Sequence, residues 1–292
     1  MDHAPGYLSS RNRHTPSTFA GLSTRFIEAE SDHVRIRVAE GTERGLPMVW
    51  IGTIREFIQT YLHVDPFRRL GDLDWLLLPS QRLFGLAGGP IYRDDLGLAR
   101  VRAKYRYFPR DVWLHLLSVQ WLRISEEEAF VGRTGAVGDD LGARLLAARQ
   151  VREVMRLEFL LERQYFPYDK WFGTAFRRLA GARPLAPWLG RVLDARTPRA
   201  REIALSKSYE ILARQQNALR IARTLPSKVS NFHDRPYLVI QAGDFAAAIR
   251  EKIRSNRIRQ LTRIGSVDQF GSTEELGSHP EQLRSLRALL RS

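Results

Sequence analysis

Two long segments with helical periodicity constrain the fold of this chain more strongly than any other feature of its sequence. The first segment opens at Pro109 and runs to about Phe130. The second starts at Asp139 or Asp140, either of which can cap a helix, and it reaches about Tyr165. We expect the apolar positions that recur at helical spacing to be buried. These are Trp113, Leu117, Trp121 and Ile124 in the first segment, and Leu141, Leu145, Ala148, Val151, Met155 and Phe159 in the second.

From about residue 98 onward the sequence is typical of helices, with further helical patterns at 198–222 and 243–255. The pattern upstream is mixed. It begins with a loop-like stretch at 1–32, an alternating strand at His33–Val38 and a helix at 49–62. An apolar segment at 74–87 follows, with Pro79 in the first turn of a new helix, and then a short strand at 91–97. We therefore expect an α+β fold that is predominantly α-helical, with an α/β region at 1–97 and a helical domain at 98–292.

The charge of the chain favours an anionic partner. Its 292 residues carry 46 lysines and arginines against 32 aspartates and glutamates, a formal net charge of +14. Nucleic acid, a nucleotide or a phosphorylated small molecule would each suit this balance. The alternative is that arginine, spread along the chain, serves only as an ordinary basic surface residue.

Other features of the composition bear on compartment and cofactors. The chain has no cysteine, so it can form neither a disulfide nor a thiolate metal site. No apolar run approaches the ~20 residues needed to cross a bilayer, and the N-terminus lacks the apolar core of a signal peptide. We expect a cytoplasmic protein that does not enter a membrane.

Four stretches of the sequence are more particular than generic helix. They are YFPRDVWLHLLSVQWLRISEEEAFVGR at 107–133, GDDLGARLLAARQVREVMRLEFLLERQYFPYDKWFGTAF at 138–176, FHDRPY at 232–237 and GSVDQF at 265–270. Together they resemble the bacterial family known as domain of unknown function 4037, over a span from about residue 73 to residue 270. Longer members of that family resemble nucleotidyltransferases, in which a polymerase-β-like domain precedes a helical domain. The resemblance implies that residues 1–97 are the remnant of such an α/β domain.

The resemblance also implies a catalytic motif that this chain does not show. A catalytic member should carry Gly-Ser and then Asp-x-Asp upstream of residue 73, and neither Gly21-Leu22-Ser23 nor Asp32-His33 provides it. Mg²⁺ and a nucleoside triphosphate would act here only if the missing half were supplied. We expect a chain that is inactive in nucleotidyl transfer or truncated, including by a start codon assigned too late. Whether it has any enzymatic activity stays open.

The GSVDQF segment at 265–270 superficially resembles a phosphate-holding Gly-Ser turn. Its nearest paired acids, Glu274 and Glu275, are adjacent, so they would point to opposite faces of a strand and could not share one Mg²⁺. The resemblance instead makes GSVDQF a tail motif beyond the helical domain.

Three residues at the end of the first long helix are candidates for a site. Glu127, Glu128 and Arg133 lie in the family block EEAFVGR, and the acids oppose the helix dipole, so Arg133 is a possible partner for them. The alternative is a solvated acidic run.

Five residues further along are candidates for binding phosphate or another substrate group. Arg149, Arg152 and Arg156 recur at helical spacing, together with Arg163, and form a basic stripe. Ordinary pairing with nearby glutamates is the alternative. Lys170 and Trp171 lie in an aromatic turn that suits either base stacking or the packing of a helix corner.

These patterns leave two hypotheses of different kinds. In the first, the helical domain of a nucleotidyltransferase-like protein binds a nucleotide or another anionic substrate. In the second, the chain is a non-catalytic interaction protein whose basic helical surface binds a protein or RNA partner.

Overall fold

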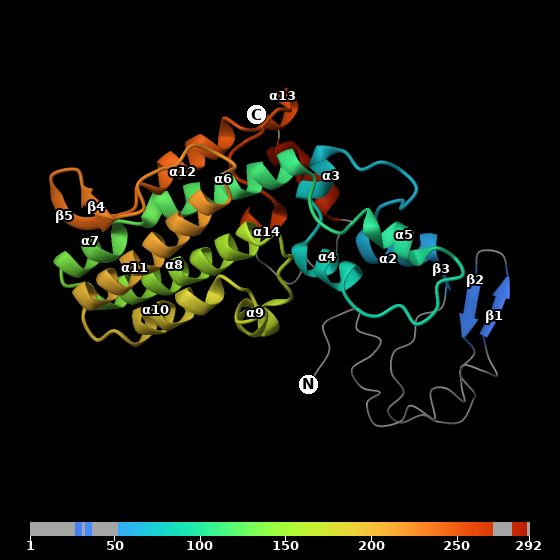
Figure 1. The fold of residues 1–292 in the computed structure, drawn as a ribbon, viewed down its shortest axis with the longest axis horizontal. Helices are drawn as coiled ribbons and strands as arrows, with labels where there is room; N and C mark the ends of the chain where they lie inside the picture. Colours follow the sequence, from blue (N-terminus) through green and yellow to red (C-terminus); the bar gives the residue numbers. More distant parts are fainter. Residues whose placement is uncertain (1–26, 31–32, 37–51, 271–281, 291–292) are drawn as a thin grey trace, which may run out of the picture.

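Figure 1 shows the computed structural model, which describes residues 27–30, 33–36, 52–270 and 282–290. The expectations for the N-terminal loop before Ile27 and for Glu274 and Glu275 lie outside these described residues. The described part of the chain is an α+β fold that is predominantly α-helical, as the sequence predicted.

The largest part of the fold is a bundle of long helices. Figure 1 shows α6, α8 and α11 running alongside one another, with α12 against α6 and α10 against α8 and α11. Its helices are α6 (Arg110–Glu127), α7 (Phe130–Ala136), α8 (Asp140–Leu161), α10 (Ala182–Asp194), α11 (Pro198–Ala218) and α12 (Ala242–Arg250). Three short helices complete this part, namely α9 (Asp169–Phe176), α13 (Asn256–Arg259) and α14 (Val267–Phe270).

Local capping residues set the starts of the long helices. Pro109 occupies the cap position of α6, and the Asp139 side chain accepts a 2.7 Å hydrogen bond from the Gly142 amide at the start of α8. Thr197 caps α11 in the same way through the Ala200 amide, and Pro198 follows it as the first helical residue. The predicted starts of all three helices are confirmed.

The predicted buried face of α8 is wrong over its first half. Leu141 and Leu145 are 70% and 65% exposed, and Ala148 is exposed too. The buried positions there are instead Ala143, Ala147 and Gln150, since α8 turns this face toward its neighbours α7 and α11. Alanine lets neighbouring helices approach closely, and the leucine face is left outside. In the second half Val151 and Phe159 are buried as expected, and Met155 is half-buried.

The N-terminal part combines a small sheet with short helices. Strands β1 (Ile27–Glu30), β2 (His33–Ile36) and β3 (Gly52–Thr53) form an antiparallel sheet in the order β1-β2-β3. The helices are α2 (Ile54–Leu62), α3 (Asp72–Leu76), α4 (Ser80–Ala87) and α5 (Leu98–Ala103), and η2 (Gln282–Leu290) lies near the C-terminus. The strand expected to begin at His33 is confirmed at its start.

The short strand predicted at 91–97 is wrong. These residues form turns, in which the Asp94 carboxylate accepts hydrogen bonds from the Leu98 and Ala99 amides at the start of α5. An aspartate that caps a helix competes with strand pairing, because it offers the backbone a local acceptor.

A hairpin, β4 (Ser230–Phe232) and β5 (Arg235–Val239), was not expected from the sequence. Phe232 pairs with Arg235 across a two-residue turn of His233 and Asp234, and His233 has a φ of 55°. The family block FHDRPY therefore forms the tip of this hairpin. His233 is the residue of this turn with the left-handed geometry, which histidine adopts more often than most side chains do.

One hydrophobic core joins the parts of the described chain. Trp75 and Leu83 of the N-terminal part belong to the same buried cluster as Trp113 and Leu157 of the bundle. The domain boundary expected near residue 97 remains a prediction. Among the described helices, not one is both long and apolar enough to cross a membrane.

Candidate functional site

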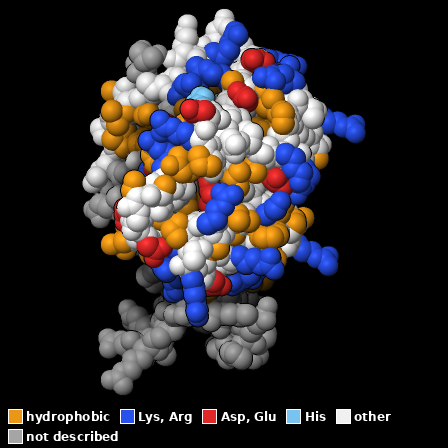
Figure 2. All heavy atoms as spheres, turned by 90° about the vertical axis from the view of Figure 1, so that its left-hand side faces the viewer, with side chains coloured by type: hydrophobic (Ala, Val, Ile, Leu, Met, Phe, Trp, Pro, Cys, Tyr) orange, Lys and Arg blue, Asp and Glu red, His pale blue; other side chains and the backbone are white. Residues whose placement is uncertain are grey.

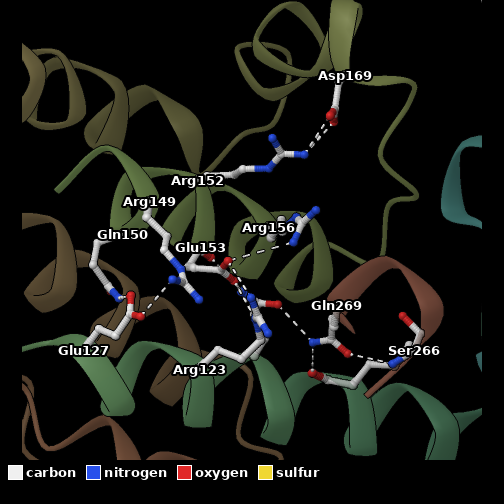
Figure 3. Close-up of polar contacts among 12 residues, drawn as sticks. Arg123, Glu127, Arg149, Gln150, Arg152, Glu153, Arg156, Asp169, Ser266 and Gln269 are labelled. Carbon is white, nitrogen blue, oxygen red and sulfur yellow. Dashed lines mark hydrogen bonds and ion pairs between the residues drawn. The ribbon is translucent and has the colours of Figure 1, made fainter. Parts of the chain in front are cut away.

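A cluster of charged and polar side chains lies where α6, α8 and α14 meet (Figure 3). We call it the arginine cluster. Its labelled members in Figure 3 are Arg123 and Glu127 of α6, Arg149, Gln150, Arg152, Glu153 and Arg156 of α8, Asp169 of α9, and Ser266 and Gln269 at α14. Gln120 of α6 also belongs to it, since it bonds both Glu153 and Gln269. Figure 3 shows these side chains converging from elements far apart in the sequence.

Glu153 is the most heavily bonded acid of the arginine cluster. Arg123 donates to both of its carboxylate oxygens at 3.0 Å, and the Gln120 amide donates to one of them at 2.6 Å. Burial alone would raise the pKa of Glu153, but the hydrogen bonds and charge of Arg123 outweigh it and lower the pKa. Glu153 is therefore ionised, and its acceptor positions are largely taken by Arg123 and Gln120.

Arg156 is the least satisfied member of the arginine cluster. Its side chain is only 6% exposed, and its Nη1 lies 3.9 Å from Glu153, beyond hydrogen-bond distance. Its Nε has no hydrogen-bond partner among the described residues. The guanidinium lies 5.7 Å from the ring centre of Phe166, and burial lowers the pKa of Arg156. A buried cation with unused donors is costly unless something accepts from it.

The outer arginines of the α8 stripe are already paired. Arg149 lies 3.1 Å from Glu127, and Arg152 donates to both carboxylate oxygens of Asp169 at 2.8 Å. The charge that the sequence placed on this face is therefore partly neutralised by ion pairs. Arg149 and Arg152 are nevertheless accessible, with side chains 57% and 39% exposed.

The Asp169 ion pair connects the arginine stripe to the predicted aromatic turn. Lys170 and Trp171 follow Asp169 directly, and the Lys170 Nζ lies 5.3 Å from the Trp171 ring centre. Lys170 is exposed and Trp171 is half-buried. The turn also packs, because Phe172 stacks on Phe159 and Phe166 meets both rings edge to face, which accounts for part of its aromatic content.

The GSVDQF motif, which the resemblance made a tail of the helical domain, packs against α6 of the bundle. The Gln269 amide donates to the Gln120 side chain at 2.9 Å and to the Leu116 carbonyl at 3.1 Å, both on α6. Its carbonyl accepts from the Ser266 amide at 3.1 Å. Gly265 has a φ of 83°, and a Cβ there would collide with Gln269, so this position requires glycine.

Asp268 of the same motif bears on Arg156. Its carboxylate accepts a 2.9 Å hydrogen bond from the Ser80 amide at the start of α4. Burial raises the pKa of Asp268 to about 6, although the charge of Arg156 opposes the shift. Asp268 is therefore largely ionised at neutral pH and its charge acts on Arg156, although no hydrogen bond joins the two side chains among the described residues.

Two predicted site residues lie apart from the arginine cluster. Glu128 accepts hydrogen bonds from the Ile240 and Ala242 amides, at 2.7 and 3.1 Å, at the start of α12. Burial raises the pKa of Glu128 to about 7. Arg133 is exposed on α7, over the Phe130 ring. Arg133, named from the sequence as a possible partner of the acidic run, forms no ion pair with it among the described residues; Glu127 pairs with Arg149 and Glu128 binds backbone amides.

Sequence reasoning missed Arg123, Gln120 and Gln269. A signal for Gln120 was its place between Val119 and Trp121, where a polar side chain interrupts an apolar run. A signal for Gln269 was the GSVDQF block itself. Neither signal names a partner, because the contact joins residues 149 positions apart.

The carboxylates of the described chain do not gather into a metal site. Within residues 27–30, 33–36, 52–270 and 282–290, no group of three histidines, aspartates or glutamates could hold a metal ion. The acids of the arginine cluster are instead bonded to arginine and glutamine.

These observations define a predominantly helical α+β protein with an arginine–carboxylate cluster between its long helices. Residues 75–172 match the family described as domain of unknown function DUF4037, and the match runs from α3 through α6 and α8 into α9. It therefore includes the stretch that carries Arg123, Arg149, Arg152, Glu153 and Arg156. No curated protein and no solved structure matches the chain.

Proposed function

We propose that this chain binds a nucleotide or another phosphorylated small molecule at the arginine cluster. The observation that carries the proposal is Arg156, a buried guanidinium whose Nε has no partner, and which has no acid within hydrogen-bond distance, in the part of the chain that the structure describes. A phosphate oxygen is the acceptor that best fits such a donor, because arginine binds phosphate with a planar fork of N–H groups.

The neighbours of Arg156 suit the same ligand. Arg149 and Arg152 are exposed enough to exchange their carboxylate partners for phosphate oxygens. Phe166 and Phe172 lie beneath Arg156 and Arg152, and Trp171 adds a half-buried aromatic face on which a base can stack. A triphosphate would fit a row of arginines spaced by one helical turn better than a single phosphate would.

The proposed role is binding rather than catalysis by this chain alone. A relation to nucleotidyltransferases, with residues 1–97 as the remnant of their α/β domain, belongs to this proposal and is supported by the motif resemblance. Mg²⁺ would take part only with a catalytic half that brings its own carboxylates. A cytoplasmic location, where nucleoside triphosphates are abundant, is part of the same proposal.

Thermal unfolding of the chain with each nucleoside triphosphate, with and without Mg²⁺, tests this function. A ligand that binds only the native state stabilises it by ~2.7 kcal/mol at a hundredfold excess over its dissociation constant. We expect at least one nucleotide to raise the midpoint without Mg²⁺. Inorganic pyrophosphate is the second probe, because it separates recognition of phosphate from recognition of the base.

Three variants locate the binding site. Arg156→Gln and Arg152→Gln should each weaken the nucleotide by about tenfold or more, since each removes a charge-assisted hydrogen bond. The matched control is Arg178→Gln, which removes the same charge from an exposed arginine in the turn after α9. Unchanged affinity in both cluster variants would contradict the proposed site, and so would a wild-type chain that no nucleotide stabilises.

A different outcome would favour the interaction-protein hypothesis. If RNA bound with a steep salt dependence and no preference for sequence, while nucleotides did not bind, the basic surface would be a nucleic-acid surface. That result would overturn the small-molecule proposal.

A further inference from the structure

Basic side chains gather where α12 ends and α13 begins. Residues 250–263 contain six cations and one acid, Glu251. Figure 1 shows this segment at the edge of the molecule, with α13 beyond the end of α12, and Figure 2 shows basic side chains spread among the others over a different face. We call the segment the basic corner and define it by its six cations, Arg250, Lys252, Arg254, Arg257, Arg259 and Arg263. Five of them are exposed, and Arg250 is half-buried.

The cations of the basic corner are not used in ion pairs. Among the described residues, none of the six side chains pairs with an acid, whereas the exposed arginines of the arginine cluster do. Asp111 of α6 lies beside the corner, but its carboxylate accepts from Arg110 and from the backbone amides of Arg254 and Ser255. Asp111 thus holds the backbone of the corner against α6 and leaves the guanidiniums available to another anion.

Two arginines of the corner act on one another and on a buried histidine. Burial, and then the charge of Arg263, lower the pKa of Arg250, which itself donates to a neutral group, the Arg259 carbonyl. Burial, and then the charges of Arg250 and Arg263, lower the pKa of His115 on α6 to about 4. Neither ring nitrogen of His115 has a hydrogen-bond partner among the described residues. The corner therefore carries a positive potential, and a bound anion would lower its energy.

The side chains exposed at the corner indicate which anion fits. Its apolar residues Ile253, Ile258 and Leu261 are buried. Leu289, whose carbonyl accepts from Thr262, is 52% exposed, but one apolar side chain provides neither a face that enters a membrane nor the apolar core of a protein interface. Interfaces with nucleic acid are more polar and much more positively charged than those between proteins. The composition of the corner is of this kind.

The residue types also indicate which part of a nucleic acid would be bound. Five of the six cations are arginines, whose planar fork of N–H groups matches the oxygens of a phosphate group. Residues 250–263 include no aromatic side chain on which a base could stack. Contacts to phosphate position a nucleic acid without reading its sequence.

We propose that the basic corner binds the phosphodiester backbone of a nucleic acid, RNA or DNA, without preference for sequence. The corner shares no residue with the arginine cluster, so this inference stands whether or not that cluster binds a nucleotide.

Fluorescence anisotropy of labelled oligonucleotides tests the proposal. The probes are single-stranded RNA, single-stranded DNA of the same sequence and duplex DNA, and the tightest of them identifies the source of the phosphodiester groups. We expect the logarithm of the affinity to fall linearly with the logarithm of the salt concentration, with a slope of about 0.7 for each phosphate neutralised on a single strand. Strands of different sequence should bind with similar affinity.

A triple variant locates the surface. Arg254→Gln/Arg257→Gln/Arg263→Gln should weaken binding by about tenfold or more and reduce the salt slope by about 2, at ~0.7 for each of three phosphates. The matched control is Arg177→Gln/Arg178→Gln/Arg183→Gln, which removes the same charge from three exposed arginines at the end of α9 and the start of α10. The control should bind almost as the wild type does, and the circular dichroism spectra of both variants should stay helical.

Arg156→Gln separates this surface from the proposed nucleotide site. It should bind oligonucleotides as the wild type does, and the corner variant should keep any stabilisation by nucleoside triphosphates. Loss of oligonucleotide binding in Arg156→Gln but not in the corner variant would overturn the proposal. A wild-type chain that binds no oligonucleotide at low salt would overturn it too, as would equal losses in the corner variant and the control. Tighter binding to vesicles of phosphatidylcholine and phosphatidylserine than to any oligonucleotide would show a membrane surface instead.

Discussion

Glu158 is a carboxyl group that the fold holds in an unfavourable environment. It is 1% exposed on α8, and its Oε2 has no hydrogen-bond partner among the described residues. Glu162 lies one turn further along the helix and accepts a 2.6 Å hydrogen bond from the Gly181 amide. Burial, and then the neighbouring charge of Glu162, raise the pKa of Glu158 to about 8.

The raised pKa makes the free energy of unfolding depend on pH. Between an ordinary glutamate pKa near 4.5 and the folded value near 8, the native state holds a proton that the unfolded chain has released. Stability therefore falls as pH rises through this window, by up to ~1.4 kcal/mol per pH unit. Above the folded pKa of Glu158 both states have released the proton, so this contribution to stability no longer changes with pH.

Replacing Glu158 with glutamine should remove this loss. The amide is uncharged at every pH and can still donate a hydrogen bond to Glu162, so Glu158→Gln should be more stable than the wild type at pH 8 and equally stable near pH 4. Urea unfolding at a series of pH values measures the difference. Glu251→Gln, at an exposed glutamate, should leave the pH profile as it was. A wild-type chain with a flat profile from pH 5 to pH 8 would contradict the assignment.

The start of α12 depends on a side chain from another element. Gln241, at its cap position, has a φ of 60°, and its side chain makes no capping hydrogen bond. Glu128, at the end of α6, accepts from the Ile240 and Ala242 amides instead. Glu128 thus satisfies amides that a helix start leaves unpaired and joins α6 to α12.

Truncating Glu128 should weaken that junction. In Glu128→Ala two buried amides lose their acceptor, at ~1–3 kcal/mol for each unsatisfied group, so the free energy of unfolding should fall by about 2–6 kcal/mol. Glu128→Gln keeps one acceptor oxygen and should cost less. Denaturant unfolding measures both variants. Glu126→Ala, two residues earlier and exposed, should change stability by no more than ~0.5 kcal/mol. Equal effects of Glu126→Ala and Glu128→Ala would disprove this capping role.

At the scale of the whole molecule, the GSVDQF motif fastens the C-terminal part of the chain to the long helices. Gln269 bonds α6 at two points, and Asp268 bonds the Ser80 amide at the start of α4. The motif therefore connects the N-terminal part, the bundle and the C-terminal part. These hydrogen bonds are buried, so breaking one would leave a polar group unpaired in the protein interior, which costs more free energy than at the surface.

Gln269→Ala should loosen this connection without unfolding the bundle. Removing the amide leaves Gln120 and the Ser266 amide short of a partner, so we expect ~1–3 kcal/mol of destabilisation. Amide hydrogen exchange should accelerate most in residues 261–270 and least in the middle of α11. Gln59→Ala, at an exposed glutamine on α2, is the control. Uniform acceleration throughout the chain, or none, would argue against a local fastening role.

Much of the fold follows from the sequence because its causes are local. Pro109 and Asp139 specify helix starts through interactions within a few residues, and helical periodicity specifies where the long helices run. The hairpin at FHDRPY and the Pro187-containing helix α10 were missed, since tertiary packing overrides a proline or a short strand signal.

The candidate site was predictable only in part. The sequence identified Arg149, Arg152 and Arg156 as one helical stripe and the Lys170–Trp171 turn as its neighbour along the chain. It did not reveal that Arg123 and Gln120 would donate hydrogen bonds to the carboxylate of Glu153. Because they do, Arg156 lies near Glu153 without a hydrogen bond to it. Pairing of that kind depends on how α6 and α8 are placed side by side.

The sequence by itself determined a mainly helical chain, the starts of its longest helices and its basic charge. Only the tertiary structure decided which face of α8 is buried, and it turned Leu141 and Leu145 outward in favour of Ala143 and Ala147. Only the tertiary structure separated Glu127, which faces the arginines, from Glu128, which caps α12. The physical reason is range. Capping and periodicity act within one or two helical turns, whereas burial and ion pairing depend on neighbours that folding brings from distant parts of the chain.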